Sequence, residues 1–264
     1  MRLKNKTAII VGAGQQPGET MGNGRATALR FAEEGASLLL VDIDQSRAEA
    51  TADLCRKAGA EVHVLAADIT RERDCAEIAA SGQRLLGRID ILHNNVGRSR
   101  GDRSTTEMDV DMWDELMNMN LKGMFMTCKH VLPVMRGQQS GVILTVSSTS
   151  AVCARGTVTY KTSKGAVNTF THHIAMENAE SGIRANVILP GLMDTPMAIE
   201  RRALESGVER ATIRAERDAQ VPLRRQMGTA WDVANAGLFL ASDEAAYITG
   251  IVLPVDGGLS ARIG

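Results

Sequence analysis

The sequence predicts one α/β domain, in which helices cover both faces of a doubly wound, seven-stranded parallel sheet. Short apolar runs of strand length alternate with longer segments of helical periodicity along nearly the whole chain. The 264 residues have the length of one large domain, and no linker, repeat or low-complexity segment interrupts them. We therefore expect a single domain over residues 1–264.

The charge balance and the apolar runs of the chain indicate which kinds of partner the protein binds. The chain carries 30 basic and 31 acidic residues, so its net charge of -1 gives no field that would attract nucleic acid or an anionic membrane. No apolar run approaches the roughly 18 residues of a membrane span, and the charged N-terminus does not resemble a signal peptide. The four cysteines have no spacing suited to a metal. We expect a cytoplasmic protein with small-molecule partners, reduced thiols and no metal.

The expected elements follow from the periodicity of each segment. Strands are predicted at 7–11, 37–41, 62–67, 89–93, 142–146, 184–189 and 251–255. Helices are predicted at 25–34, 46–58, 71–86, 110–135, 158–179 and 233–240. The polar segment 98–107 is interpreted as an exposed loop at the mouth of a cleft. The charged segment 195–227 has helical stretches and is interpreted as a flap over the substrate.

A glycine-rich loop separates the first strand from the first helix. It begins at Gly12 and ends in Gly22-Asn23-Gly24. Glycines let the backbone approach a pyrophosphate, and the helix N-terminus offers amide hydrogens and a positive dipole end. A flexible surface loop remains the alternative, since one glycine pattern is weak evidence.

The ends of the next strands supply further candidates for a nucleotide site. Asp42 ends the second strand, where a carboxylate accepts hydrogen bonds from an adenosine ribose and repels a 2′-phosphate. Ile43 follows it in place of a basic residue, which favours NAD over NADP. The alternative for Asp42 is an ordinary turn-initiating aspartate. Asp68 and the stretch 94–97 also lie just past strand ends, where ligands of parallel sheets bind.

The sequence places Tyr160 and Lys164 four residues apart in the segment 158–179. On a helix they share a face, and an ammonium beside a phenol lowers the phenol's pKa from about 10 toward the range of general acid/base catalysis. A solvated helix face remains the alternative when this pair is considered alone.

Taken together, the motifs resemble those of the short-chain dehydrogenase/reductase family over nearly the whole chain. They are the glycine loop, Asp68, Asn94-Asn95-Val96-Gly97, Asn120, Ser147-Ser148, Tyr160 with Lys164, Pro190-Gly191 with Thr195, and Asp256-Gly257-Gly258. The resemblance implies a single-domain Rossmann fold. It also implies an oxidoreductase that transfers a hydride between NAD(H) and a secondary alcohol or ketone.

The resemblance implies residue roles as well. Tyr160 corresponds to the general acid/base, Lys164 to the residue that lowers its pKa and holds the nicotinamide ribose, and Asn120 to the residue that holds a water linking Lys164 to solvent. The implied catalytic set is Asn120, Ser148, Tyr160 and Lys164. The implied cofactor set is Gly12, Gly22, Asn23, Gly24, Asp42, Ile43, Asp68, Ile69, Asn95, Val96, Gly97, Tyr160, Lys164, Pro190, Gly191 and Thr195.

Two neighbouring serines compete for the role of substrate hydrogen-bond donor. Alignment on the fifth strand selects Ser148, 12 residues before Tyr160, whereas the family's spacing is often one residue longer and would select Ser147. Side chains alternate along a strand, so only one of two neighbours faces the cleft. The strand register favours Ser148.

The glycine loop departs from the family pattern, which usually has three residues where nine separate Gly12 from Gly22. The extra residues, within Gln15 to Met21, either fold outward or lie against the cofactor or the substrate mouth. The flap arginines allow two interpretations, an anionic substrate or a solvated face of ion pairs. They are Arg201, Arg202, Arg210, Arg214, Arg217, Arg224 and Arg225.

Other functions remain open at this stage. Some relatives of the fold catalyse epimerisation or dehydration, and a non-catalytic nucleotide sensor would keep the fold without the chemistry. The resemblance also implies a homotetramer that pairs the helix of Asn120 and the helix of Tyr160 with those of a neighbour.

Overall fold

The computed structural model describes residues 1–153 and 157–262. Seven parallel strands form one sheet in the order β3-β2-β1-β4-β5-β6-β9. They are β1 (Thr7–Val11), β2 (Ser37–Asp42), β3 (Val62–Ala66), β4 (Ile91–Asn94), β5 (Gly141–Val146), β6 (Ile183–Pro190) and β9 (Val252–Val255). The predicted single-domain Rossmann fold with a seven-stranded parallel sheet is confirmed.

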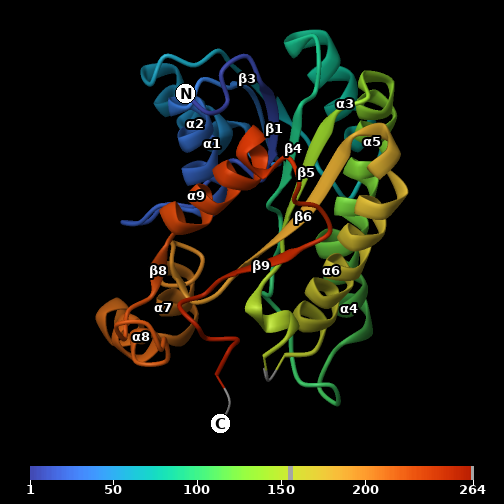
Figure 1. Ribbon diagram of the computed structural model, residues 1–264. Helices are drawn as coiled ribbons and strands as arrows, with labels where there is room; N and C mark the ends of the chain where they lie inside the picture. The colour runs from blue at the N-terminus through green and yellow to red at the C-terminus, as the bar shows by residue number, and fades with distance from the viewer. Residues whose placement is uncertain (154–156, 263–264) are drawn as a thin grey trace.

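Helices cover both faces of the sheet (Figure 1). One face carries α1 (Asn23–Glu33), α2 (Gln45–Lys57) and α9 (Ala230–Ala241), and the other carries α3 (Glu72–Leu86), α5 (Gly123–Gln138) and α6 (Thr159–Glu177). The central strands are largely apolar because both faces of the sheet are buried there: Ile10 and Leu40 belong to the first core, Ile9 and Leu39 to the second. Burying each such side chain stabilises the fold by roughly 1.5–3 kcal/mol.

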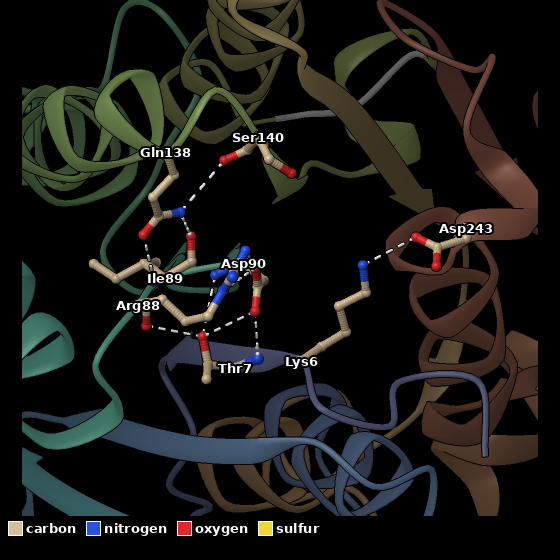
Figure 2. Close-up of polar contacts among 8 residues, drawn as sticks. All are labelled: Lys6, Thr7, Arg88, Ile89, Asp90, Gln138, Ser140 and Asp243. Carbon is tan, nitrogen blue, oxygen red and sulfur yellow. Dashed lines mark hydrogen bonds and ion pairs between the residues drawn. The ribbon is translucent and has the colours of Figure 1, made fainter.

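Side-chain hydrogen bonds fill the amino-terminal edge of the sheet (Figure 2). The side chain of Gln138 pairs with the backbone of Ile89, accepting from its N–H at 2.9 Å and donating to its carbonyl at 2.8 Å. The carboxylate of Asp90 accepts from the backbone N–H of Thr7 at 2.9 Å. Because the Gln138 side chain takes both backbone groups of Ile89, this residue forms no strand pairing, and β4 starts at Ile91, two residues later than predicted.

The long helix expected at 110–135 is present as an unbroken helical segment, but it is not α-helical throughout. It consists of α4 (Val110–Met117), a π-helical turn (Asn118–Lys122) and α5, which ends before Gln139 in a left-handed conformation with φ 53°. Asn120 lies within the π turn and is fully buried. Such turns often occur at functional sites because the extra residue redirects side chains.

The segment predicted as a flap is bounded by a two-stranded sheet of its own. Strand β7 (Met193–Asp194) pairs with β8 (Gly228–Thr229), and between them lie α7 (Glu200–Ser206) and α8 (Arg210–Asp218). An apolar cluster separate from the main cores holds it together: Leu192, Ile199, Ile213, Val221 and Met227. Figure 1 shows α7 and α8 together beside β8 at one end of the molecule.

Three short 3₁₀ turns complete the described elements, at Thr149–Ala151, Ala179–Ser181 and Asp243–Ala245. The four cysteines are free thiols, and burial raises the pKa of Cys55, Cys75 and Cys128 to about 12. Within residues 1–153 and 157–262, no helix combines the length and apolarity that a bilayer crossing requires. Nor does this part of the chain contain a group of three or more His, Cys, Asp or Glu side chains that could hold a metal ion.

Candidate active site

A cleft of about 900 Å³ opens at the carboxyl edge of the sheet. It lies where the strand order reverses, between β1 and β4, which is the position at which open α/β sheets bind ligands. Every residue predicted to bind the cofactor lines this cleft: Gly12, Gly22, Asn23, Gly24, Asp42, Ile43, Asp68, Ile69, Asn95, Val96, Gly97, Tyr160, Lys164, Pro190, Gly191 and Thr195.

The glycine loop packs too tightly for larger residues. A Cβ atom on Gly24 would lie 2.0 Å from the carbonyl oxygen of Gly12, and Gly12 itself has a φ of +82°. The side chain of Asn95, which follows β4, donates to the same carbonyl at 3.1 Å and so joins the two sides of the switch point. Because α1 starts at Asn23, its N-terminal amides face the cleft. These features fit the phosphates of a dinucleotide.

The two acidic residues beyond β2 and β3 are held by local hydrogen bonds. The Asp42 carboxylate accepts from the backbone N–H groups of Gly14 at 2.8 Å and Asp44 at 3.1 Å. The Asp68 carboxylate accepts from the backbone N–H and the hydroxyl of Thr70, at 3.0 and 2.7 Å. Each side chain is thereby fixed in orientation at the cleft wall.

The helix α6 brings Lys164 beside Tyr160, as the spacing predicts. The Lys164 Nζ lies 5.7 Å from the centre of the Tyr160 ring and donates to the carbonyl of Val146 at 2.8 Å and, more weakly, to that of Val96 at 3.5 Å. The side chain is buried, and this burial lowers the pKa of Lys164 to about 7. Both of its protonation states are therefore populated near neutral pH.

The two serines after β5 have different environments. Ser147 is buried, and its hydroxyl donates to the carbonyl of Lys164 at 3.0 Å, which ties β5 to α6. Ser148 is half-buried, and its hydroxyl oxygen accepts from the backbone N–H of Ser150 at 3.1 Å. The Ser148 hydroxyl hydrogen is not used in that bond and can be donated to another acceptor. Both serines line the cleft. The Ser147 hydroxyl has a structural partner, which agrees with the strand register.

Asn120 is the one predicted catalytic residue outside the set that lines the cleft in the described chain. Its amide oxygen accepts from the backbone N–H of Arg98 at 2.8 Å. Its amide nitrogen donates to the Arg98 carbonyl at 2.9 Å and to the Ser163 hydroxyl at 3.2 Å. Asn120 therefore joins the loop after β4 to α6 from behind the cleft.

The enlarged glycine loop lies against the flap. Gln15 closes the loop on itself, since its side chain accepts from the Gly22 N–H at 2.7 Å. Glu19 forms ion pairs with Arg210 at 2.9 Å and Arg214 at 3.7 Å. A Cβ atom on Gly18 would lie 2.9 Å from side-chain atoms of the flap. Of the two orientations left open by the sequence, the loop does not fold outward but packs against the segment 195–227.

The flap arginines divide into groups. Arg210 and Arg214 take part in ion pairs with Glu19, Glu200 and Asp194, which agrees with the interpretation as an ion-paired face. Three others line the cleft: Arg201, Arg202 and Arg217. The remaining two are exposed and lie outside the cleft lining: Arg224 and Arg225.

Asp102 lines the cleft and was not among the predicted site residues. The loop 98–107 was expected to be exposed, but Asp102 within it is only 9% exposed, and it lines the cleft. Its carboxylate accepts hydrogen bonds from the N-terminal end of α6. No local pattern reveals this role, because its partners lie more than fifty residues further along the chain.

Comparison with known proteins gives consistent matches over the whole chain. A family model described as enoyl-(acyl carrier protein) reductase matches residues 18–260. The 3-oxoacyl-(acyl-carrier-protein) reductase of Thermotoga maritima is 35% identical over 262 residues, which cover 98% of this chain and 99% of the relative.

Two solved structures are similar in both sequence and fold. A Burkholderia xenovorans protein, assigned to the short-chain dehydrogenases/reductases, has 38% identity and a TM-score of 0.94, covering 100% of this chain and 99% of that one. Carveol dehydrogenase of Mycobacterium avium, solved in complex with NAD, has 29% identity and a TM-score of 0.90, and 99% of each chain is covered. The present chain is an oxidoreductase, and it belongs to the NAD(P)-dependent short-chain dehydrogenase/reductase family.

Proposed function

We propose that this protein transfers a hydride between NAD(H) and a secondary alcohol or its ketone, with Tyr160 as the general acid/base. The observation that carries the proposal is the meeting of Tyr160, Lys164 and Ser148 in one cleft at the switch point of the sheet. A phenol beside a buried amine and a half-buried hydroxyl can exchange a proton with a substrate oxygen and hold that oxygen in place.

Each group has a distinct task in this proposal. Tyr160 gives a proton to the carbonyl oxygen in reduction and takes it back in alcohol oxidation, a contribution of about 10²–10⁴-fold to the rate. Ser148 donates a hydrogen bond to the same oxygen. Lys164, in its ammonium form, stabilises the phenolate of Tyr160, and its low pKa allows it to pass the proton on near neutral pH.

The cofactor is proposed to lie along the switch point, with its pyrophosphate over the glycine loop and its adenosine ribose at Asp42. When bound, the nicotinamide supplies or accepts the hydride. Asp42 would accept hydrogen bonds from the ribose hydroxyls and would repel a 2′-phosphate, so NAD is preferred over NADP. The other residues of the cofactor set would contact adenine, ribose and nicotinamide from the surrounding strand ends.

Further parts of the proposal concern the surroundings of the site. Asn120 keeps the backbone at Arg98 in place and would thereby support a water between Lys164 and solvent. The flap, residues 195–227, would cover the substrate. We also propose a homotetramer in the cytoplasm, with sedimentation as the test of assembly; a stable monomer would contradict it.

A screen of secondary alcohols with NAD and with NADP, following absorbance of the reduced cofactor, tests the function. Reduced cofactor should form with NAD and at least one alcohol of the panel. If NADH binds and no alcohol or ketone in a broad panel reacts, a nucleotide sensor is the better account. Substrate conversion without net formation of NADH would indicate an epimerase or dehydratase, and a clear preference for NADP would contradict the role of Asp42.

A further inference from the structure

The loop that follows β4 returns to the start of the helix that carries Tyr160. Asp102, in this loop, places its carboxylate against the first turn of α6. One oxygen accepts from the backbone N–H of Tyr160 at 2.7 Å, and the other accepts from the N–H groups of Thr159 and Arg103, each at 3.0 Å. The carbonyl of Arg103 accepts from the N–H of Val158 at 3.0 Å. Three successive N–H groups at the start of α6 are thus satisfied by residues 102 and 103.

The helix has no cap of its own at this end. Val158 is the N-cap residue of α6 and forms no side-chain capping bond. The first N–H groups of a helix have no intrahelical acceptors, and a carboxylate there is stabilised by the helix dipole. Since Asp102 is 57 residues before Thr159, the position of this helix end depends on how the loop docks.

Further contacts hold the same loop along α6. Asn120 binds the backbone of Arg98 and donates to Ser163, while the Nζ of Lys164 reaches the carbonyl of Val96. The loop is therefore fixed beside Lys164 at one end and beside Tyr160 at the other. The residues between these two points line the cleft: Ser99, Arg100, Gly101, Asp102 and Arg103. A single short segment thus forms part of the cleft wall and also anchors the helix that carries the proposed acid/base.

We propose that Asp102 is a positioning residue for Tyr160, which holds the phenol in register with Ser148 and Lys164. Its hydrogen bond reaches the backbone of Tyr160 itself, so a shift of Asp102 displaces the residue that exchanges the proton. A displacement of about 1 Å at a reacting group can cost on the order of 10²-fold in rate. The inference rests on the proposed function, because it gives Tyr160 its catalytic role.

The test compares Asp102→Ala and Asp102→Asn with a matched control. Asp109 has the same kind of capping bond, from its carboxylate to the N–H of Met112 at 3.0 Å, but it caps α4 outside the cleft lining. With a substrate from the alcohol screen, kcat should fall about 10²-fold in Asp102→Ala and by a smaller factor in Asp102→Asn, which keeps one acceptor oxygen. The substrate KM and the dissociation constant of NADH, measured by fluorescence, should change less than about twofold, because Asp102 is not among the residues proposed to bind the cofactor and its carboxylate binds backbone N–H groups of the chain.

Asp109→Ala should lower the melting temperature as Asp102→Ala does, yet keep the wild-type kcat. The inference is overturned if the Asp102 variants keep kcat within about twofold of wild type, or if kcat falls equally in Asp109→Ala. It is also overturned if NADH affinity falls in parallel with kcat, which would indicate general damage to the fold. If Asp102→Ala does not fold, the kcat, KM and NADH affinity of Asp102→Asn test the inference instead. A wild-type protein that oxidises no alcohol, or a Tyr160→Phe variant with full activity, would instead refute the proposed function, and the inference with it.

Discussion

The two walls of the cleft are held by different forces. The wall formed by β5, α6 and the loop after β4 is joined by buried hydrogen bonds, such as that from Lys164 Nζ to the Val146 carbonyl at 2.8 Å. The wall formed by the flap and the enlarged glycine loop is joined by partly exposed ion pairs, such as Arg210 with Glu19 at 2.9 Å. Breaking a buried hydrogen bond costs about 1–3 kcal/mol, whereas an exposed ion pair contributes about 0–1 kcal/mol. The proposed chemistry thus lies on the wall that is costly to deform, and the segment proposed to cover the substrate lies on the wall that can adjust.

The largest effect is expected on the first wall, from Tyr160→Phe. The variant keeps the ring beside Lys164 and removes the hydroxyl group whose proton the mechanism exchanges. We expect kcat to fall by about 10²–10⁴-fold while NADH affinity, measured by fluorescence, is retained. Retention of more than about a tenth of wild-type kcat would show that Tyr160 is not the general acid/base.

Variants of the two serines in the first wall separate a catalytic role from a structural one. Ser148→Ala should lower kcat by about 10²-fold, the range seen when one donor to a developing oxyanion is removed. Ser147→Ala should instead lower the free energy of unfolding by about 1–2 kcal/mol, because the Lys164 carbonyl loses its partner, and should keep most of the activity. Steady-state kinetics and urea unfolding of both variants separate the two roles. The reverse pattern would mean that the predicted strand register is wrong.

A buried histidine in the central sheet should make the free energy of unfolding depend on pH in the acid range. His93 lies in β4 with no exposed surface, both of its ring nitrogens lack a hydrogen-bond partner among the described residues, and burial lowers its pKa to about 4. Below the ordinary pKa of about 6.5 the unfolded chain binds a proton that the folded protein does not, so stability is lost as pH falls from 6.5 toward 4. The loss attributable to this group should reach roughly 2–3 kcal/mol at about pH 4.5.

Urea unfolding at about pH 7 and 4.5 measures this difference. His93→Leu should reduce the loss of stability between these two pH values, and His173→Gln, an exposed histidine on α6, should leave it as in wild type. Equal pH dependence in wild type and His93→Leu would show that His93 protonates freely in the folded protein.

The smallest effect is expected at the flap, from Glu19→Gln. Loss of its ion pairs with Arg210 and Arg214 should change the free energy of unfolding by less than about 1 kcal/mol and raise the KM for NADH by less than about fivefold. Raising NaCl from about 0.05 to 0.5 M should remove the difference from wild type, because salt screens exposed charges. Glu49→Gln, which breaks an exposed pair with Arg56 on α2, is the matched control and should leave KM unchanged. A tenfold or larger effect of Glu19→Gln on kcat would contradict an adjustable wall.

Much of the fold could be predicted because it depends on local periodicity. Apolar runs such as 37–41 belong to buried parallel strands, and the four-residue spacing of Tyr160 and Lys164 places both on one side of α6. Element ends were less predictable: the predicted first residue of β4, Ile89, forms no strand pairing because the side chain of Gln138, 49 residues further along the chain, takes its backbone groups. The π turn around Asn120 was also missed, because its cause is the packing of α4 and α5 on neighbouring elements.

The order of strands and helices along the chain, the glycine loop and the residue types at the strand ends follow from the amino-acid sequence. These features depend on neighbouring residues and on the requirement that each apolar face be buried. Three contacts arise only on folding: Asp102 caps α6, the Ser147 hydroxyl donates to the Lys164 carbonyl, and the enlarged glycine loop contacts the segment 195–227. Each of these contacts joins residues far apart in the chain, and each becomes possible only once the sheet has aligned the strand ends along one edge.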